Sequence, residues 1–310
     1  MKQKWLSMLL VLVLLLTAAT SMASAGTEAT ISGAISESGV TVQVENLTVA
    51  ARLVIAQYHY GQLVDVVTEN VSCDGSYAIT AQKLVKGDEF KLFLMDQQSS
   101  APLCKAVLPV QTEDLLITES TTVDNGSYRN VTIAESVGDG DVTFNNVTIY
   151  GDLLVEGGGS NTVSMSGCHV HGRVNINKTS GEPPRLHLTN TDLPKVEANQ
   201  PAIIEAADSN SSVGELTASS DVTIQGAATK VETVTVSNTN TTPTVTVAEG
   251  AKIETVAVSP NANANVTVEA GASVIAVEAK GETTIHAAGT VSSVTATASV
   301  NVSSGAVERV

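Results

Sequence analysis

Aromatic side chains are scarce in this chain of 310 residues, which contains five Tyr, three Phe and one Trp. None of them follows Tyr150, so the last 160 residues contain no ring. Because Phe, Tyr and Trp supply much of the area buried in a wide core, such a core is excluded there. The remaining apolar residues are mostly Val, Ala, Ile and Leu, which suit narrow, closely spaced layers.

Basic residues are also few, since 16 Lys and Arg face 32 Asp and Glu, for a formal net charge of −16. Residues 1–25 contain two lysines and no acid, so their removal changes the charge to −18. A charge of this sign and size repels phosphate backbones. Nucleic acid is therefore excluded as an expected partner.

Long apolar runs are missing except at the N-terminus. Lys2 and Lys4 precede the apolar run Met8–Leu16, and the small-x-small pattern Ala23–Ala25 follows. This arrangement predicts a signal peptide over residues 1–25, cleaved after Ala25. The mostly apolar stretch 6–19 is shorter than the about 20 residues that a membrane span needs. We therefore expect a secreted or cell-surface protein that does not span the membrane, with its mode of retention left open.

Only three cysteines are present, Cys73, Cys104 and Cys168. Cys73 and Cys104 lie in the same expected domain and could form a disulfide in an exported protein. Buried free thiols are the alternative, and both interpretations stay open at this point.

Residues 27–111 consist of short alternating runs bounded by Gly, Asp or Ser. The runs are Val40–Val44, Arg52–Tyr60, Leu63–Val67, Tyr77–Thr80 and Phe90–Leu94. Gly61 separates the second run from the third, which is a hairpin signal. Regularly spaced short strands of this kind predict an antiparallel β-sandwich.

The same segment resembles the immunoglobulin-like modules of bacterial surface proteins. The resemblance rests on the hairpin Tyr58–Leu63, on Lys91–Leu94 and on Pro102-Leu103, and it covers about eighty residues. It implies an immunoglobulin-like β-sandwich over residues 27–111.

From residue 121 to residue 310 the chain becomes repetitive. Five clear copies begin at residues 222, 245, 266, 283 and 300, and their third positions lie 23, 21, 17 and 17 residues apart. A period near twenty with alternating Val predicts the coils of a parallel β-solenoid, and the crossover rule makes the coil right-handed. Two inward ladders are expected, one formed by Ile224, Val247, Val268, Ile285 and Val302, and another by Val234, Val256, Val277 and Val294.

A second resemblance concerns the start of this repetitive region. It rests on six segments of strands and turns: Tyr128–Ile133, Gly140–Thr143, Asn146–Ile149, Gly151–Val155, Gly157–Asn161 and Val174–Lys178. They resemble the opening coils of the right-handed parallel β-helix regions in large bacterial cell-surface proteins. The resemblance implies a fold and a location on the cell surface, but no activity. The expected fold class is thus all-β, with an N-terminal antiparallel sandwich followed by a right-handed parallel β-helix.

Parallel β-helices also host pectinases and polysaccharide lyases, which need clustered carboxylates or a carboxylate-bound calcium ion with an Arg or Lys base. The candidate acids are Asp124, Asp139, Asp141, Asp152 and Glu156, and the candidate bases are Arg129, Arg173 and Arg185. Most of these acids adjoin Gly or Asn at turns, where Asp is favoured for local hydrogen bonding. Because a fold alone does not confer catalysis, we expect no catalytic residue and no enzyme.

Two short motifs raise the question of a metal. Gly138–Asp141 lacks the spaced oxygen ligands of a calcium loop, so a plain turn is expected. In Cys168-His169-Val170-His171 both histidines would share one strand face, but two ligands do not make a zinc site. An exposed polar face is expected there, and no metal or cofactor.

These expectations together describe an exported, non-catalytic structural or adhesive protein of the cell surface. Its expected partner is a cell-wall polymer or another surface protein. The alternative is a carbohydrate-active β-helix protein, either lyase-like or glycan-binding, although few rings exist to stack on a sugar. The C-terminal coil at Val300–Val310 carries little charge, and it is also expected to support end-to-end self-association.

Overall fold

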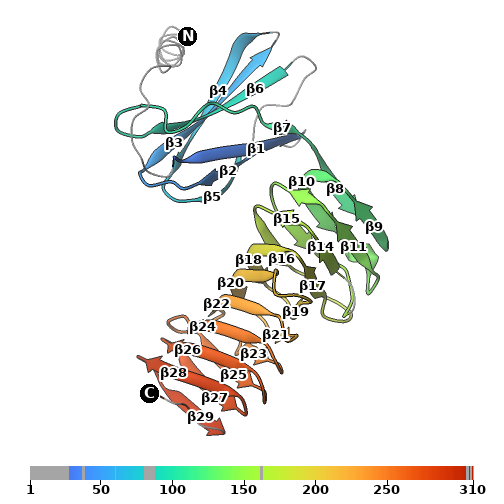
Figure 1. Cartoon of the computed structure of the whole chain (residues 1–310), viewed down its shortest axis with the longest axis vertical. Coiled ribbons are helices and arrows are strands. Elements are labelled where there is room, and N and C mark those ends of the chain that lie inside the picture. The colour runs from blue at the N-terminus through green and yellow to red at the C-terminus, as the bar shows by residue number, and fades with distance from the viewer. Residues whose placement is uncertain are drawn as a thin grey trace. The chain divides into compact units, whose positions relative to one another are not determined.

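The computed structural model describes residues 28–36, 39–59, 61–79, 88–160, 163–304, 307 and 309. The expected signal peptide, residues 1–25, lies outside the described residues. The chain divides into two compact units between Glu113 and Asp114 (Figure 1). In the described part, the one helix is a 3-10 turn at Glu135–Val137. No helix among these residues is long and apolar enough to cross a membrane.

The N-terminal unit contains two small sheets that bury a common core. One sheet has the order β5-β2-β1-β7 and the other β4-β3-β6. Their strands are β1 (Thr30–Ser36), β2 (Gly39–Glu45), β3 (Ala51–His59), β4 (Gln62–Val71), β5 (Gly75–Ile79), β6 (Asp88–Asp96) and β7 (Val110–Gln111). All pairings are antiparallel except that of β1 with β7. The expected antiparallel sheets are confirmed.

The core of this unit follows from the alternation in its strands. Val42 on β2, Leu53 on β3 and Leu92 on β6 are fully buried and belong to one apolar cluster. The hairpin between β3 and β4 turns at Gly61, whose φ of 79° lies in the left-handed region that favours glycine. The hairpin predicted at this glycine is therefore confirmed.

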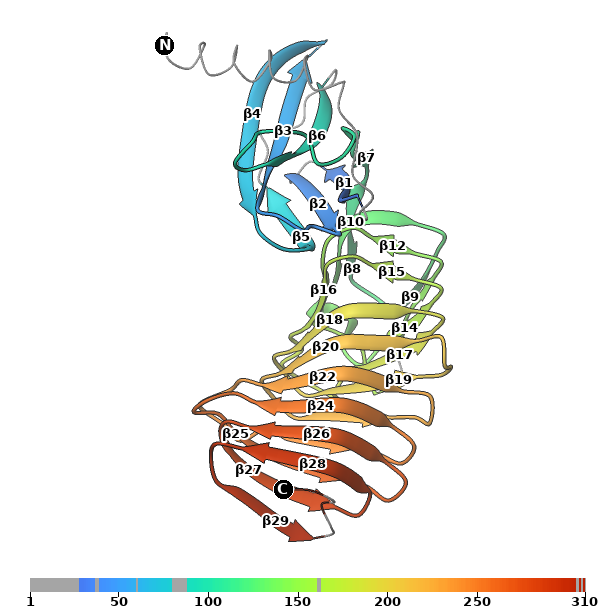
Figure 2. The same cartoon turned by 60° about the vertical axis from the view of Figure 1, so that its left-hand side comes forward.

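The second unit is a β-solenoid of parallel strands from residue 121 to residue 304 (Figures 1 and 2). One long sheet contains ten strands, which bound nine complete coils. Its strands are β9 (Thr121–Asp124), β11 (Val142–Asn145), β14 (Val163–Ser166), β17 (Arg185–Thr189), β19 (Ala202–Ala206), β21 (Val222–Gln225), β23 (Thr244–Val247), β25 (Asn263–Val268), β27 (Glu282–Ala287) and β29 (Val300–Ser304). The coil is right-handed (Figure 2), as the crossover rule predicts.

The other long sheet contains twelve strands. They are β8 (Glu113–Ile117), β10 (Ser127–Ile133), β12 (Thr148–Ile149), β13 (Leu153–Val155), β15 (His169–Val170), β16 (Arg173–Ile176), β18 (Asp192–Ala198), β20 (Ser212–Ala218), β22 (Lys230–Val236), β24 (Lys252–Val258), β26 (Ser273–Ala279) and β28 (Thr290–Ala296). The first coils use two short strands where later coils use one of seven residues, because β18 pairs with both β15 and β16.

The seven-residue strands bend in the middle. In β22 the buried residues are Val231, Val234 and Val236, so the strict alternation is broken once. The pairing of β22 with β24 skips Glu232 and Glu254 at this bend. Each coil therefore has three sides, and its second and third sides meet at the bend. This meeting edge is called the bend corner below.

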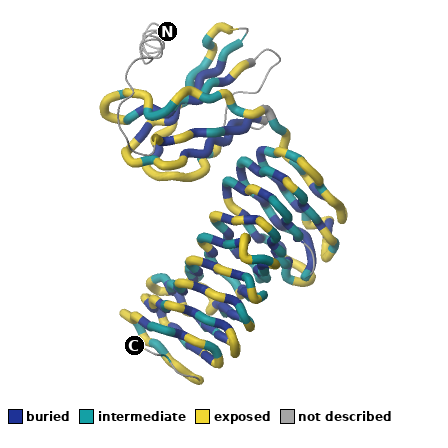
Figure 3. Tube along the Cα trace, in the orientation of Figure 1, coloured by how far each residue is buried: buried dark blue, intermediate teal, exposed yellow. Residues whose placement is uncertain are grey.

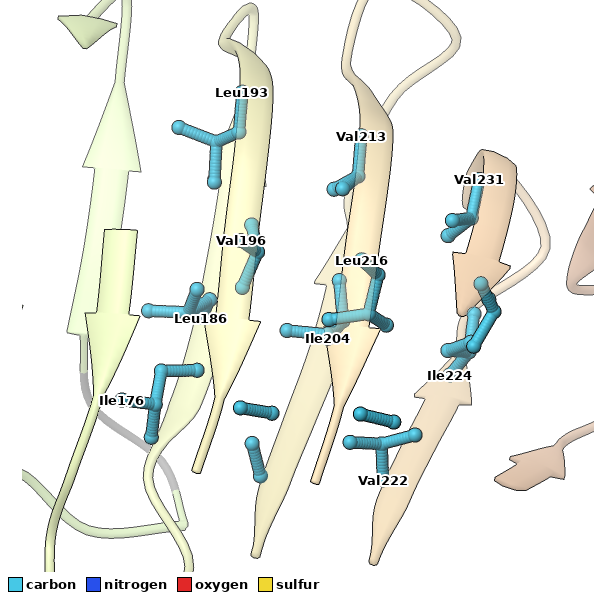
Figure 4. Close-up of a cluster of buried hydrophobic side chains, with 14 of the residues drawn as sticks. Ile176, Leu186, Leu193, Val196, Ile204, Val213, Leu216, Val222, Ile224 and Val231 are labelled. Carbon is cyan, nitrogen blue, oxygen red and sulfur yellow. The ribbon is translucent and has the colours of Figure 1, made fainter. Parts of the chain in front are cut away.

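Inward residues of successive coils stack in ladders, so buried and more exposed positions alternate along the strands (Figure 3). Figure 4 shows Val196, Leu216 and the neighbouring aliphatic side chains inside the coils. The predicted ladder Val234, Val256, Val277 and Val294 is confirmed, because each residue pairs in register with the next. Val247 likewise pairs with Ile224 and with Val268.

One predicted step of the first ladder is wrong. Ile285 pairs with Val266, whereas Val268 pairs with Ala287. The predicted pairing of Ile285 with Val268 differs from the observed pairing by two residues. Such a shift keeps every side chain on its own face, because the side-chain period of a strand is two. Alternation alone therefore cannot distinguish the two registers.

The last predicted ladder position is only half right. Val302 pairs with Ile285, as predicted, but Val302 is 40% exposed and not buried. Among the described residues β29 pairs with β27 alone, so one side of this strand is uncovered.

The corner between the first and second sides is built from left-handed residues. Asn125, Asn146, Gly167 and Asn190 have φ between 46° and 62°. Asn tolerates this conformation better than most residues. The stacked side chains also bond, since Asn146 Nδ2 donates to Asn125 Oδ1 at 3.3 Å. This explains why Asn recurs at a turn for which Gly would otherwise be expected.

Candidate functional site

Polar side chains gather at the bend corner of the first coils. Successive coils place Tyr150, His171 and Pro194 there, because Ile149, Val170 and Leu193 precede them on neighbouring strands. The backbone needs room at this edge, since a Cβ atom on Gly172 would meet the carbonyl oxygen of Gly151. The name polar corner is used below for these residues together with Asp114, Arg129, Asn130, Asp152, Arg173, Lys195 and Glu197.

A relay of side-chain acceptors connects the coils at the polar corner. Asp114 Oδ1 accepts the backbone N–H of Asn130 at 3.1 Å, and Asn130 Oδ1 accepts that of Asp152 at 3.0 Å. Asp152 Oδ1 in turn accepts the N–H of Arg173 at 2.9 Å. Each acceptor thus satisfies an amide of the next coil where the chain turns, because unpaired backbone amides destabilise a fold.

Ion pairs reinforce this relay. Arg129, whose side chain is 9% exposed, places Nε 3.1 Å from Asp114 Oδ1 and Nη2 3.2 Å from Asp114 Oδ2. This two-pronged geometry is a strong form of carboxylate binding. Two coils further on, Arg173 Nη1 lies 3.1 Å and 3.2 Å from the two oxygens of Glu197.

Glu197 is the centre of the second charge group. Lys195 Nζ lies 3.3 Å from Glu197 Oε1, and Asp152 Oδ2 lies 3.6 Å from Arg173 Nε. Hydrogen bonding to Glu197 raises the pKa of the Arg173 guanidinium. These charges compensate one another, so no bare cation or anion is offered by this group.

A further polar group lies on the outer face of β17, β19 and β21. Glu205 Oε2 accepts from Arg185 Nη1 at 3.0 Å and from Gln225 Nε2 at 2.6 Å. His187 Nε2 lies 3.8 Å from Glu205 Oε1. Glu205 therefore connects three neighbouring coils.

The candidate base residues each pair with an acid that the sequence did not indicate. Arg129 pairs with Asp114, Arg173 with Glu197 and Arg185 with Glu205. These partners lie 15, 24 and 20 residues away in sequence. Only the stacking register could have revealed them, since one coil brings residues about twenty positions apart into contact.

The candidate acids are distributed rather than clustered. Asp124 accepts from Asn145 Nδ2 at 2.8 Å, and Asp152 belongs to the relay. Asp141 and Glu156 lie on different coils, before β11 and after β13. Among the described residues, no group of three or more His, Cys, Asp and Glu side chains could hold a metal ion.

Asp139 is bound to a buried lysine. The Lys178 side chain is 3% exposed, and its ammonium group contacts Asp139 Oδ1. The same group donates to the carbonyl oxygens of Gly158 and Glu182 at 2.7 Å each. A buried ammonium needs such acceptors, and here they fasten three chain segments together. Gly138–Asp141 is a turn, as predicted.

The two histidines expected on one strand face have different surroundings. His169 is exposed on β15, whereas His171 follows the strand at the polar corner. Its ring stacks on that of Tyr150, with centroids 5.5 Å apart and planes inclined by 13°. The two rings therefore cover part of each other's faces.

All three cysteines are free thiols, so the disulfide considered for Cys73 and Cys104 is not formed in this structure. Cys73 is exposed and Cys168 is buried. Burial raises the pKa of the Cys168 thiol, which donates to the carbonyl oxygens of Phe144 and Ser166 at 3.4 Å.

Compared with known protein families, curated proteins and solved structures, the chain shows no significant match. The arrangement of its own side chains therefore carries the functional argument. Its polar groups hold adjacent coils together through carboxylates that are already paired with cations or amides.

Proposed function

We propose that this chain is an exported, non-catalytic structural or adhesive protein of the bacterial cell surface. In this proposal the β-solenoid is a stiff spacer, and the N-terminal unit is an immunoglobulin-like module that it displays. A cell-wall polymer or another surface protein is the partner. The observation that carries the proposal is the use of outer-face charges as ties between coils.

Three ties support a stiffening role. The Asp114 to Arg173 relay, the Arg173–Glu197 pair and the Arg185–Glu205 pair all connect residues of different coils. A catalytic carboxylate instead needs a vacant approach for substrate and a second group within reach. Glu197 and Glu205 each hold two or more partners, which favours a structural role for them.

The alternative is a carbohydrate-active protein, and one observation favours it. The Tyr150–His171 stack lies beside Arg173 and Asp152, and rings next to polar groups are a common arrangement for binding sugars. The stack, however, directs each ring face at the other ring. Stacking thus covers one face of each ring, so a sugar would have less aromatic surface to contact, which disfavours this alternative.

The test begins with fractionation of the producing cells, using antibodies against the mature chain. Surface or medium localisation, with binding to purified cell walls or to a surface protein, is the expected result. Mature protein should release no unsaturated product from acidic polysaccharides. Product release that depends on Arg173 or Glu205, or retention of the protein inside the cell, would overturn the proposal.

A glycan array separates the alternative from the proposal. Wild type and the Tyr150→Ala/His171→Ala double variant are applied side by side, with Thr235→Ala on a distant outer face as the matched control. Glycan binding that only the double variant loses would establish the alternative.

A further inference from the structure

The outer edge of β4 is the longest strand edge in the N-terminal unit. β4 has ten residues, and among the described residues it pairs with β3 alone. Leu63, Val66 and Val67 are only half buried, and Val64 is 47% exposed. A long apolar edge of this kind presents backbone groups that can pair with a strand of another chain.

One backbone group on this strand is already occupied by a side chain. Asp65 Oδ1 accepts the N–H of the next residue, Val66, at 2.9 Å. Leu92 on β6 exchanges both backbone hydrogen bonds with Val107, so its partner Ile55 bonds to β4 instead. Ile55 pairs with Val67, and because hydrogen-bonding pairs alternate in an antiparallel ladder, the amide of the adjacent Val66 points away from β3. An incoming strand would need that amide as a donor. The carboxylate must therefore leave before a strand can pair at the middle of β4.

Two neighbouring features also oppose the pairing of a strand with β4. A register shift between Gln57 and Tyr58 leaves Val64 as an extra residue on β4, and such bulges twist an edge away from flat pairing. Asp65 also lies on the same strand face as Val67 and Val71, which pack on the core. A charged residue on that face of an edge strand opposes strand addition, which would desolvate it.

We propose that β4 is a docking edge for a second copy of this chain, and that Asp65 keeps the edge closed. A second copy is favoured because β4 is complementary to itself in an antiparallel register centred on Val66. In that register Val66 faces its own symmetry mate, Asp65 faces Val67, and Leu63 faces Glu69. No acid faces an acid, as pairs of like charge would be destabilising.

The Val66-centred register also explains why the side chain of Asp65 accepts its hydrogen bond from the amide of Val66. The two central hydrogen bonds between the copies would use the two Val66 amides, one from each copy. Asp65 occupies both of these donors in the separate chains. Asp65 thus prevents the hydrogen bonds that would form at the centre of the interface.

The experiment compares mature wild type, Asp65→Ala, Asp65→Asn and Glu69→Ala by sedimentation velocity over a wide concentration range. Asp65→Ala should associate, with a midpoint concentration at least about tenfold below that of wild type, the factor expected when a hydrogen bond closing the edge is lost. Asp65→Asn keeps an acceptor oxygen without the charge, so its midpoint concentration should lie between those of wild type and Asp65→Ala and nearer to that of wild type. Glu69→Ala loses the same charge from the same face but keeps the bond from the Val66 amide to Asp65, so its midpoint should fall by less than that of Asp65→Ala.

A second substitution assigns the association to β4. Val66→Pro removes the amide, and Pro is tolerated on the free side of an edge strand. Asp65→Ala/Val66→Pro should therefore return to the wild-type association state. Association that persists in this double variant, or that appears equally in Glu69→Ala, would overturn the proposal.

Amide exchange in the wild-type chain decides the matter if Asp65→Ala does not fold. The Val66 amide should exchange about tenfold more slowly than that of Thr68, the next amide on the same side of β4. Equal exchange rates would show that Asp65 does not cap the edge, and would overturn the proposal without reference to any variant.

Discussion

Ile285 stands directly on Val266 in the parallel register between β25 and β27. Both side chains are fully buried. A double-mutant cycle tests this contact. Val266→Ala and Ile285→Ala should couple by roughly 1 kcal/mol, since contacting core residues are not additive. The cycle of Val268→Ala with Ile285→Ala should give a smaller coupling, because Val268 stacks on Ala287 instead. Equal couplings in urea unfolding would contradict the register.

Val268 offers a direct test of the inward ladder. It is fully buried on β25, so Val268→Asp would place an unpaired carboxylate in the apolar interior. The free energy of unfolding should fall by about 4 kcal/mol. Thr267→Asp, on the opposite face of the same strand, is the matched control and should stay within about 1 kcal/mol of wild type. An equal loss in the free energy of unfolding for the two variants would contradict the assignment of Val268 to the inner face.

The sequence predicts the type of each unit but not the contacts of the solenoid surface. Alternating Val, a period near twenty and missing rings were enough to predict parallel coils, because they reflect the narrow interior. Coil length varies, however, and the two-residue ambiguity at Ile285 leaves side-chain facing unchanged. Pairs such as Arg173–Glu197, 24 residues apart, depend on that register. They could not be derived from alternation alone.

The polar corner makes a prediction about capping. Asp152→Ala removes the acceptor of the Arg173 amide and should cost about 1 kcal/mol in the free energy of unfolding. Asp152→Asn keeps an acceptor oxygen and should stay within about 0.5 kcal/mol of wild type, because the ion pair with Arg173 is half exposed and contributes little. Chemical denaturation measures both. An equal loss in the two variants would mean that the charge, rather than the cap, stabilises this corner.

Asp139 should make stability depend on pH. Hydrogen bonding by Lys178 holds the pKa of the Asp139 carboxyl below its ordinary value. A carboxyl with a depressed folded pKa stabilises the fold above its unfolded pKa, and that contribution is lost as the pH falls through the folded value. The difference in stability between wild type and Asp139→Asn should therefore be largest near neutral pH and shrink below about pH 4. Urea midpoints across this range measure it, and a difference independent of pH would contradict the pairing.

The three thiols should react in an order set by their burial. Cys73 is exposed, whereas burial raises the pKa of the Cys104 and Cys168 thiols and so lowers the fraction of reactive thiolate. Brief alkylation of the native mature protein should modify Cys73 first and Cys168 only after unfolding, as read from the masses of proteolytic fragments. Cys168→Ala is the control for partial unfolding. It should take up as much label as wild type under native conditions, because Cys168 is expected to react only in unfolded protein. A protein that takes up label only after reduction, with Cys73 and Cys104 modified together, would instead carry the disulfide between them.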